Sequence, residues 1–229
     1  MGKKKKAKTK NNPETKTNKR LLFYLAGILV VVLVVIGVVF MPGEEDAEES
    51  AGADYSNVTR PVATIALESG EVIQVELDPT AAPNTVKNFI ALASEGFYDG
   101  LIFHRVIPGF MIQGGCPLGQ GTGGPGYSIR GEFSDNNHEN PLTHVRGAIS
   151  MARSNHPDSA GSQFFIMLAP ASHLDGQYAA FGMVTEGMEA VDRIVGVDRD
   201  PHDKPLEDQV IESITIETFG VEYPPPDKL

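Results

Sequence analysis

A run of alternating residues at positions 103–115, FHRVIPGFMIQGG, constrains the fold more than any other part of this chain. Apolar and polar side chains alternate on both sides of a Pro-Gly turn, so the run predicts two paired strands. Because side chains two apart in a strand share a face, we expect Arg105 to lie beside Phe103. On the returning strand, Gln113 should lie beside Met111 in the same way. The hairpin would place a fixed cation, an amide and an apolar wall around one small volume, although an ordinary hairpin with an exposed arginine has the same pattern.

Strand and helix signals continue along the chain in short segments. Residues 62–67 and 72–77 alternate around a Ser-Gly pair, which predicts a hairpin. Pro83 can open a helix because its missing N–H falls where a helix has no partner for it, and Gly96 can end that helix. Further short strands are expected at 101–106, 110–114, 147–152, 163–168, 179–184 and 209–218, with a second helix over 187–195. Many short strands with two helices predict a β-barrel or sandwich capped by helices.

Three more motifs follow the first: GAISMARS at 147–154, GSQFFIM at 161–167 and HLDGQYAAFG at 173–182. In this order and spacing, the four motifs resemble the cyclophilin family of peptidyl-prolyl cis–trans isomerases over about residues 61–220. The resemblance implies a mainly β fold, a closed eight-stranded antiparallel β-barrel capped by two α-helices. It also implies isomerase activity on proline-containing peptides and on folding proteins.

Isomerisation of an X–Pro bond breaks no covalent bond, so the implied reaction needs no metal, cofactor or nucleophile. The resemblance implies that Arg105 is the catalytic arginine, which bonds to the proline nitrogen as the amide twists. Gln113 corresponds to the residue that orients Arg105 and the substrate carbonyl. The remaining substrate contacts that the resemblance implies are an apolar proline pocket of Phe110, Met111, Phe165 and Leu174, the second amide Gln163, the edge residues Ala152 and Arg153, and the groove residues His173 and Tyr178.

Three positions depart from the commonest eukaryotic pattern of the family and give the chain a bacterial-like character. His173 stands where that pattern has tryptophan, Arg153 where it has asparagine, and Tyr178 where it has histidine. Loss of an indole N–H and a large apolar face should leave only weak binding of the inhibitor cyclosporin. Arg153 can still offer its backbone to a substrate. His104 is expected on the opposite strand face from Arg105, in a structural role, and no shared site is indicated for His138, His144, His156 and His202.

The N-terminal part of the chain has a separate character. Residues 1–20 hold eight Lys, Arg20 and one acid, a net of +8, so the chain's net charge of −11 leaves −19 for the other 209 residues. Leu21–Met41 then carries no charge over 21 residues. As a helix it would span about 31 Å, close to the hydrocarbon thickness of about 30 Å. A basic run directly before an apolar segment favours a membrane over a nucleic-acid partner, so we expect a transmembrane signal-anchor that contacts the lipid bilayer.

The positive-inside rule keeps residues 1–20 in the cytoplasm and sends the rest of this single-pass chain across the cell membrane. An acidic linker is expected at 42–60, the isomerase domain at 61–220 and a Pro-rich tail at 221–229. A cleaved signal peptide is the alternative. The apolar run exceeds the usual signal-peptide length of about 7–15 residues, while Ala51–Ala53 leaves later processing open.

Two other functions fit parts of the sequence. A non-catalytic peptide-binding or holdase module could use the same groove, but simple binding would not need Arg105. A Ser/His/Asp hydrolase is disfavoured because the GxSxG motif is absent. The Gly-rich run at 114–126 lacks the phosphate-loop pattern and indicates a flexible surface loop. The lone Cys116 cannot form an intramolecular disulfide.

Overall fold

The computed structural model describes residues 54–229, and the expected membrane span at 21–41 lies outside them. Every strand and helix expected between residues 61 and 220 has a counterpart, but the strand expected at 101–106 is only the short β3 at its end, and β7 runs two residues beyond the expected 184. The elements are β1 (Val62–Leu67), β2 (Val72–Leu77), α2 (Pro83–Ser94), β3 (Arg105–Ile107), β4 (Met111–Gly114), β5 (Ala148–Met151), β6 (Phe164–Met167), β7 (Ala180–Glu186), α3 (Met188–Val195) and β8 (Ile211–Glu217).

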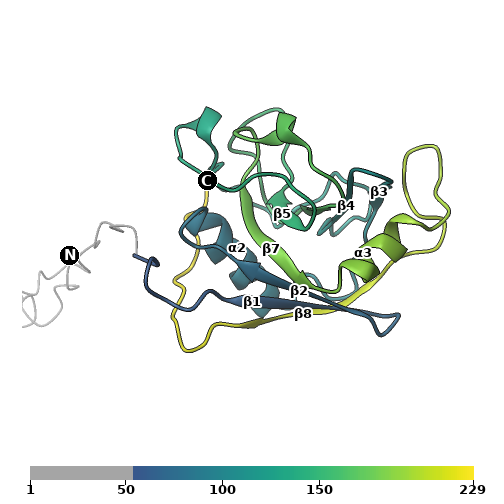
Figure 1. Cartoon of the computed structure of the whole chain (residues 1–229), viewed down its shortest axis with the longest axis horizontal. Coiled ribbons are helices and arrows are strands. Elements are labelled where there is room, and N and C mark those ends of the chain that lie inside the picture. Colours follow the sequence, from purple (N-terminus) through teal and green to yellow (C-terminus); the bar gives the residue numbers. More distant parts are fainter. Residues whose placement is uncertain (1–53) are drawn as a thin grey trace, which may run out of the picture. The chain divides into compact units, whose positions relative to one another are not determined.

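The eight strands form one antiparallel sheet in the order β3-β4-β6-β5-β7-β2-β1-β8. The sheet curls around a common interior, and α2 and α3 lie apart from each other along it (Figure 1). Neighbours in sequence pair directly in the β1–β2 and β3–β4 hairpins, whereas β7 joins the two halves by pairing with both β2 and β5. The predicted mainly β fold with two helices is therefore confirmed.

The closed barrel expected from the resemblance is not formed by a continuous strand ladder. The edge strands β3 and β8 do not pair along their length: the segment before β3 meets the start of β8 and the residues before it, where Ile102 bridges Val210, Phe103 N–H donates to the Gln209 carbonyl at 3.0 Å and Ile211 N–H donates to the Leu101 carbonyl at 2.8 Å. Within β3 itself, Val106 N–H donates instead to the Asp203 carbonyl at 2.8 Å. Because the loop carrying Asp203 bonds to the edge of β3, β8 cannot pair along that edge. The sheet is therefore a curled half-barrel whose two edges meet over only a few residues.

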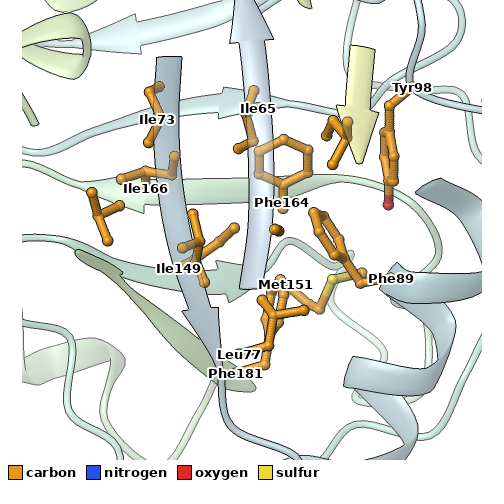
Figure 2. Close-up of a cluster of buried hydrophobic side chains, with 14 of the residues drawn as sticks. Ile65, Ile73, Leu77, Phe89, Tyr98, Ile149, Met151, Phe164, Ile166 and Phe181 are labelled. Carbon is orange, nitrogen blue, oxygen red and sulfur yellow. The ribbon is translucent and has the colours of Figure 1, made fainter. Parts of the chain in front are cut away.

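The interior of the sheet holds the main hydrophobic core, which the alternation of β1 and β2 already indicates. Their inward residues include Ile65, Ile73 and Leu77, each fully buried. Figure 2 shows these side chains converging with aromatic rings from α2 and β6. Phe89 of α2 lies at the centre, with its ring centroid 5.6 Å from that of Phe164 in an edge-to-face arrangement. Such burial stabilises a fold by roughly 1.5–3 kcal/mol per large apolar side chain.

Helix α2 begins where the sequence predicts and is capped from a distant segment. Pro83 stands in its first turn, and the buried Glu132 carboxylate accepts hydrogen bonds from the backbone N–H groups of Asn84 at 2.9 Å and Thr85 at 2.7 Å. A carboxylate at this end also suits the helix dipole. Gly96, with φ of +69°, follows the last turn and ends the helix as expected. The cap fixes the loop around Glu132 to α2.

Candidate active site

Nine of the residues singled out in the sequence line one hollow of about 160 Å³ on the outside of the sheet. They come from the β3–β4 hairpin and its turn, from β6, from the segment after β5 and from the segment that runs from the Ser172–Leu174 turn to β7. Arg105 and Gln113 are direct cross-strand partners in the β3–β4 hairpin. The nine residues are Arg105, Phe110, Met111, Gln113, Ala152, Arg153, Phe165, Leu174 and Tyr178. The resemblance thus names residues that the fold brings together.

Arg105 presents an unneutralised charge at the edge of this hollow. Its side chain is exposed, and no hydrogen bond or salt bridge joins its guanidinium to any residue in the described range 54–229. A guanidinium is planar, always charged and carries five N–H donors. These donors are therefore available to a ligand that occupies the hollow.

The expected pairing of Arg105 with Phe103 is wrong. Phe103 is fully buried in the main core, where its ring meets that of Phe164 edge-to-face at 6.1 Å. The strand alternation does not extend that far, because β3 begins only at Arg105 and the residues before it bridge to the segment before β8. The two side chains consequently lie on opposite sides of the sheet.

The apolar floor of the hollow comes from other residues. Met111, Phe165 and Leu174 are buried there, and they form a small cluster separate from the main core. Half-buried Phe110 completes it, with the exposed His173 ring stacked on it at 6.2 Å between centroids. Met111 and Gln113 therefore border the same hollow, as expected from their spacing. The arrangement offers a small apolar space, the size of one ring, beside a cation.

Gln113 is held by a second amide rather than by Arg105. Its Nε2 donates to Oε1 of Gln163 at 3.0 Å, and Nε2 of Gln163 donates to the carbonyls of Gly121 at 3.0 Å and Gly123 at 2.8 Å. Gln163 lies beside the first hollow, in the wall of a second one of about 470 Å³ that shares Gln113, Ala152 and Arg153 with it. The Gly-rich run is thus tied to the site, which its composition did not indicate.

Arg153 is committed to the protein itself. Its Nε and Nη2 donate to the Gln177 carbonyl at 3.0 and 2.9 Å, and its guanidinium lies 4.6 Å from the ring centroid of Tyr178. A second aromatic ring, that of Phe133, lies 5.1 Å away. Such cation–π contacts fix an arginine in place. Arg153 therefore shapes the rim of the hollow, and its backbone is the part left for a ligand.

A chain of three polar side chains lies directly behind the floor. His144 Nδ1 lies 2.9 Å from Asp175 Oδ1, and its Nε2 lies 3.0 Å from Ser150 Oγ. These contacts have the order of a hydrolytic triad, but Ser150 is fully buried in β5 and cannot reach a substrate. The His144 ring is stacked on Phe165 at 5.9 Å, and burial lowers the pKa of His144. The chain supports the floor from behind.

Sequence reasoning missed the place of His144. Ser150 and Asp175 lie inside two of the four motifs, whereas His144 lies just before GAISMARS. No spacing in the sequence predicts that these three side chains meet, because His144 and Asp175 come together through hydrogen bonds between two loops, where Ala171 N–H donates to the His144 carbonyl and His144 N–H donates to Asp175 Oδ1, each at 2.8 Å. The only indication of this chain of polar side chains in the sequence was that Ser150 and Asp175 lie inside two of the motifs.

His104 is buried on the other face from Arg105, as expected, and neither ring nitrogen has a hydrogen-bond partner within residues 54–229. Burial lowers the pKa of His104, and the positive charges of Arg105 and Lys204 lower it further. The neutral ring is therefore favoured in the folded state. Its contribution to stability is present above the unfolded pKa of about 6.5 and is lost as the pH falls below that value.

Replacing His104 by leucine should consequently flatten the acid side of the stability profile. Between pH 7 and pH 5, we expect the free energy of unfolding of His104→Leu to fall less than that of the parent chain, because a buried group no longer has to bind a proton. Urea unfolding at several pH values measures this. The matched variant His202→Leu, at an exposed histidine, should follow the parent, and a parent-like slope for His104→Leu would refute the assignment.

Comparison with known proteins identifies the fold and the reaction. The sequence model of the family described as "Cyclophilin type peptidyl-prolyl cis-trans isomerase/CLD" matches residues 62–216. The chain belongs to this family. The matched range includes all eight strands, nearly to the end of β8, and every residue of the two hollows. As a cyclophilin, the chain is a peptidyl-prolyl cis–trans isomerase.

Cyclophilins of known sequence and structure agree with the family match. The chain is 58% identical to peptidyl-prolyl cis-trans isomerase B of Bacillus subtilis over 123 residues, which are 54% of this chain and 82% of that protein. It is 50% identical to an isomerase of Helicobacter pylori over 134 residues, 58% of this chain and 78% of the other. A crystal structure of a Cryptosporidium parvum cyclophilin in the presence of the dipeptide Ala-Pro superposes with a TM-score of 0.62 at 34% identity, covering 68% of this chain and 98% of that one.

The membrane prediction concerns residues that the structure does not describe. Within residues 54–229, neither helix has the length and apolar character needed to cross a bilayer. The expected signal-anchor at Leu21–Met41 and most of the expected linker fall outside this range. One linker residue inside it, Tyr55, is buried and stacks on Tyr223 with ring centroids 5.2 Å apart.

Proposed function

We propose that this cyclophilin accelerates X–Pro isomerisation by hydrogen bonding from Arg105 to the proline nitrogen of a twisted amide. When the amide twists, the nitrogen loses resonance and gains a lone pair that a guanidinium N–H can reach. The bond is weak in either planar form, so it lowers the barrier rather than simply adding affinity. The observation that supports this role is the unneutralised guanidinium directly opposite Gln113, at the edge of an apolar floor.

The size of the required effect is compatible with one such bond and a fitted pocket. An uncatalysed X–Pro bond isomerises in tens to hundreds of seconds. Raising this to an enzyme-like rate of roughly 1–1000 per second takes about 3–7 kcal/mol at 1.36 kcal/mol per decade. A charged hydrogen bond in a partly desolvated hollow contributes a large share of that amount.

The remaining side chains have binding roles in this proposal. The apolar floor holds the proline ring, while Gln113, whose Nε2 donates to Gln163, lines the same hollow with an amide oxygen that accepts no hydrogen bond from residues 54–229 and is available to the peptide. Ala152 and Arg153 offer backbone groups along one edge. Cyclosporin should bind only weakly, because His173 presents a smaller and more polar ring beside Phe110 than a tryptophan would.

We further propose that the enzyme is a bacterial-type, membrane-anchored cyclophilin that acts on proteins folding outside the cytoplasmic membrane. The support comes from sequence: nine basic residues within 1–20, an uncharged span of 21 residues at Leu21–Met41, and an acidic stretch after it. The Lys/Arg bias favours a cytoplasmic N-terminus and an external isomerase domain. Isomerisation requires no nucleotide, so it can proceed in that compartment.

The topology has a direct test. Protease added to intact cells, stripped of any wall or outer envelope, should digest the domain or clip the linker at 42–60. An epitope placed before residue 21 should survive the same treatment. Complete protection of the domain until the membrane is lysed would mean that the orientation is reversed. Release of a soluble fragment without added protease would support the cleaved-signal alternative.

A further inference from the structure

Residues 223–229, here called the strap, are bound along the domain rather than hanging from its end. The sequence indicated only a Pro-rich tail, yet Pro226 is buried and Tyr223 stacks on Tyr55 with the rings 9° from parallel. Figure 1 shows the C end of the chain beside α2. The strap lies beyond residue 216, where the family match ends.

The register of the strap is set by one asparagine of α2. Asp227 N–H donates to Oδ1 of Asn84 at 2.8 Å, and Nδ2 of Asn84 donates back to the Asp227 carbonyl at 3.0 Å. A salt bridge from Lys87 to the Asp227 carboxylate at 3.4 Å adds a third contact. Two reciprocal backbone bonds fix position 227 along the chain direction, so the residues that follow it have defined places.

The next two residues contact the loop that leads out of the second hollow. The Lys228 ammonium lies 4.1 Å from the ring centroid of Tyr127, and Leu229 N–H donates to the Ser128 carbonyl at 2.8 Å. The Tyr127 hydroxyl donates to Oδ1 of Asn88 at 2.8 Å, and Nδ2 of Asn88 donates to the Gly161 carbonyl at 2.7 Å. A continuous series of contacts therefore runs from the strap to Gly161.

Tyr127 and Gly161 both line the second hollow. In the stretch between Gln163's anchor at Gly123 and Tyr127, the two glycines pack against nothing, because a Cβ placed at Gly124 or Gly126 would meet nothing within 4 Å. Glycines also lose the most conformational freedom on ordering. Between them, the Pro125 ring packs against Gly161, where an added Cβ would lie 2.8 Å from Pro125 Cδ. This wall is consequently held by Gln163 at one end, by the contact of Pro125 with Gly161 in the middle, and by the contacts of Tyr127 and Ser128 at the other end.

We propose that the strap is a specificity-determining element that positions the Tyr127 wall of the second hollow. The inference rests on the proposed use of the first hollow for proline. The two hollows share Gln113, Ala152 and Arg153, so an extended peptide with its proline in the first continues into the second. Alternate side chains of an extended chain share a face, so the residue two positions from proline enters the second hollow. Lys228 is a positioning residue, acting through Tyr127.

Kinetics of the full chain in detergent, with two peptide series, test the proposal. One series varies the residue two positions before proline from glycine to leucine and phenylalanine, and the other varies the residue two positions after it. For Lys228→Ala we expect KM to rise about twofold to fivefold for the large residues of one series, the factor that corresponds to a lost cation–π contact. The kcat should not change, because the contact affects ground-state and transition-state binding equally.

Three further variants define the outcome. Lys228→Arg should restore the parent KM, since a guanidinium also stacks on a tyrosine ring. Lys204→Ala, which removes a half-buried lysine that pairs with Asp208 and does not line the second hollow, should behave as the parent in both series. A chain ending at residue 222 should show a larger rise in KM, about tenfold, for the large residues of the same series.

The proposal would be overturned if KM changed equally in both peptide series. It would also be overturned if KM of the shortened chain changed in neither series. Peptides with glycine at the varied position report on the proposed use of the first hollow. If the parent chain does not isomerise them, that assignment fails by itself. If every variant isomerises the glycine peptides at the parent rate, the first hollow is intact. Any change in KM for peptides with leucine or phenylalanine at the varied position is then caused by the change in the strap.

Discussion

Replacing Arg105 by alanine is expected to lower kcat/KM for proline peptides at least tenfold while the fold is retained. Arg105 is exposed, and its guanidinium makes no hydrogen bond or salt bridge within residues 54–229, so its removal creates no buried cavity and leaves no buried group unpaired. What is lost is a hydrogen bond formed only as the amide twists, which lowers kcat and kcat/KM together. A protease-coupled assay on a proline peptide measures both constants.

Arg105→Lys is the matched control for charge. An ammonium keeps the positive charge but presents its donors at a different reach and without a planar fork, so an intermediate rate is expected. Circular dichroism and thermal unfolding should be unchanged in both variants. Near-parental isomerisation by a folded Arg105→Ala protein would refute the assigned mechanism.

The largest stability effect is expected at the centre of the core. Phe89→Ala should lower the free energy of unfolding by about 3–5 kcal/mol, because it removes a fully buried ring between α2 and the sheet. The Phe89 ring meets those of Tyr98, Phe164 and Phe181 at centroid distances of 5.2, 5.6 and 5.3 Å. The surrounding rings belong to different elements and cannot all close the gap.

Urea unfolding of residues 54–229 measures this loss, and Phe89→Leu serves as the matched variant. It keeps most of the apolar volume, so a smaller cost is expected. Parental stability of Phe89→Ala would mean that the site collapses freely around the missing ring. That result would contradict the central position assigned to α2 in the core.

Local patterns in the sequence were sufficient for most of the fold. The β1–β2 hairpin has the predicted bounds because its residues alternate strictly and its turn is short. Helix α2 likewise begins at Pro83, where a local steric rule decides. The same reasoning failed at Phe103. The sequence placed Phe103 and Arg105 on one strand, but β3 begins only at Arg105, so Phe103 lies outside the strand. Where a strand begins depends on its pairing with segments that are distant in sequence, and no local pattern predicts that pairing.

The candidate site divides in the same way. The motifs name Arg105, Gln113 and the apolar floor, because the resemblance carries these residues over one by one, and the structure brings them together around the first hollow. The residues that hold them were not identified. His144 behind Phe165 and the carbonyls that anchor Gln163 act through contacts between segments far apart in sequence. The strap is the most distant example, since Asp227 meets Asn84 across 143 positions.

The central claim is that Arg105 recognises the twisted amide and not the planar peptide. NMR line shapes of a labelled proline peptide, recorded over a titration, give the dissociation constant and the cis–trans exchange rate on the enzyme separately. For Arg105→Ala, the account predicts a dissociation constant within about threefold of the parent and an exchange rate on the enzyme at least tenfold lower. An unchanged exchange rate with peptide affinity lowered tenfold would contradict it and would make Arg105 a binding residue only.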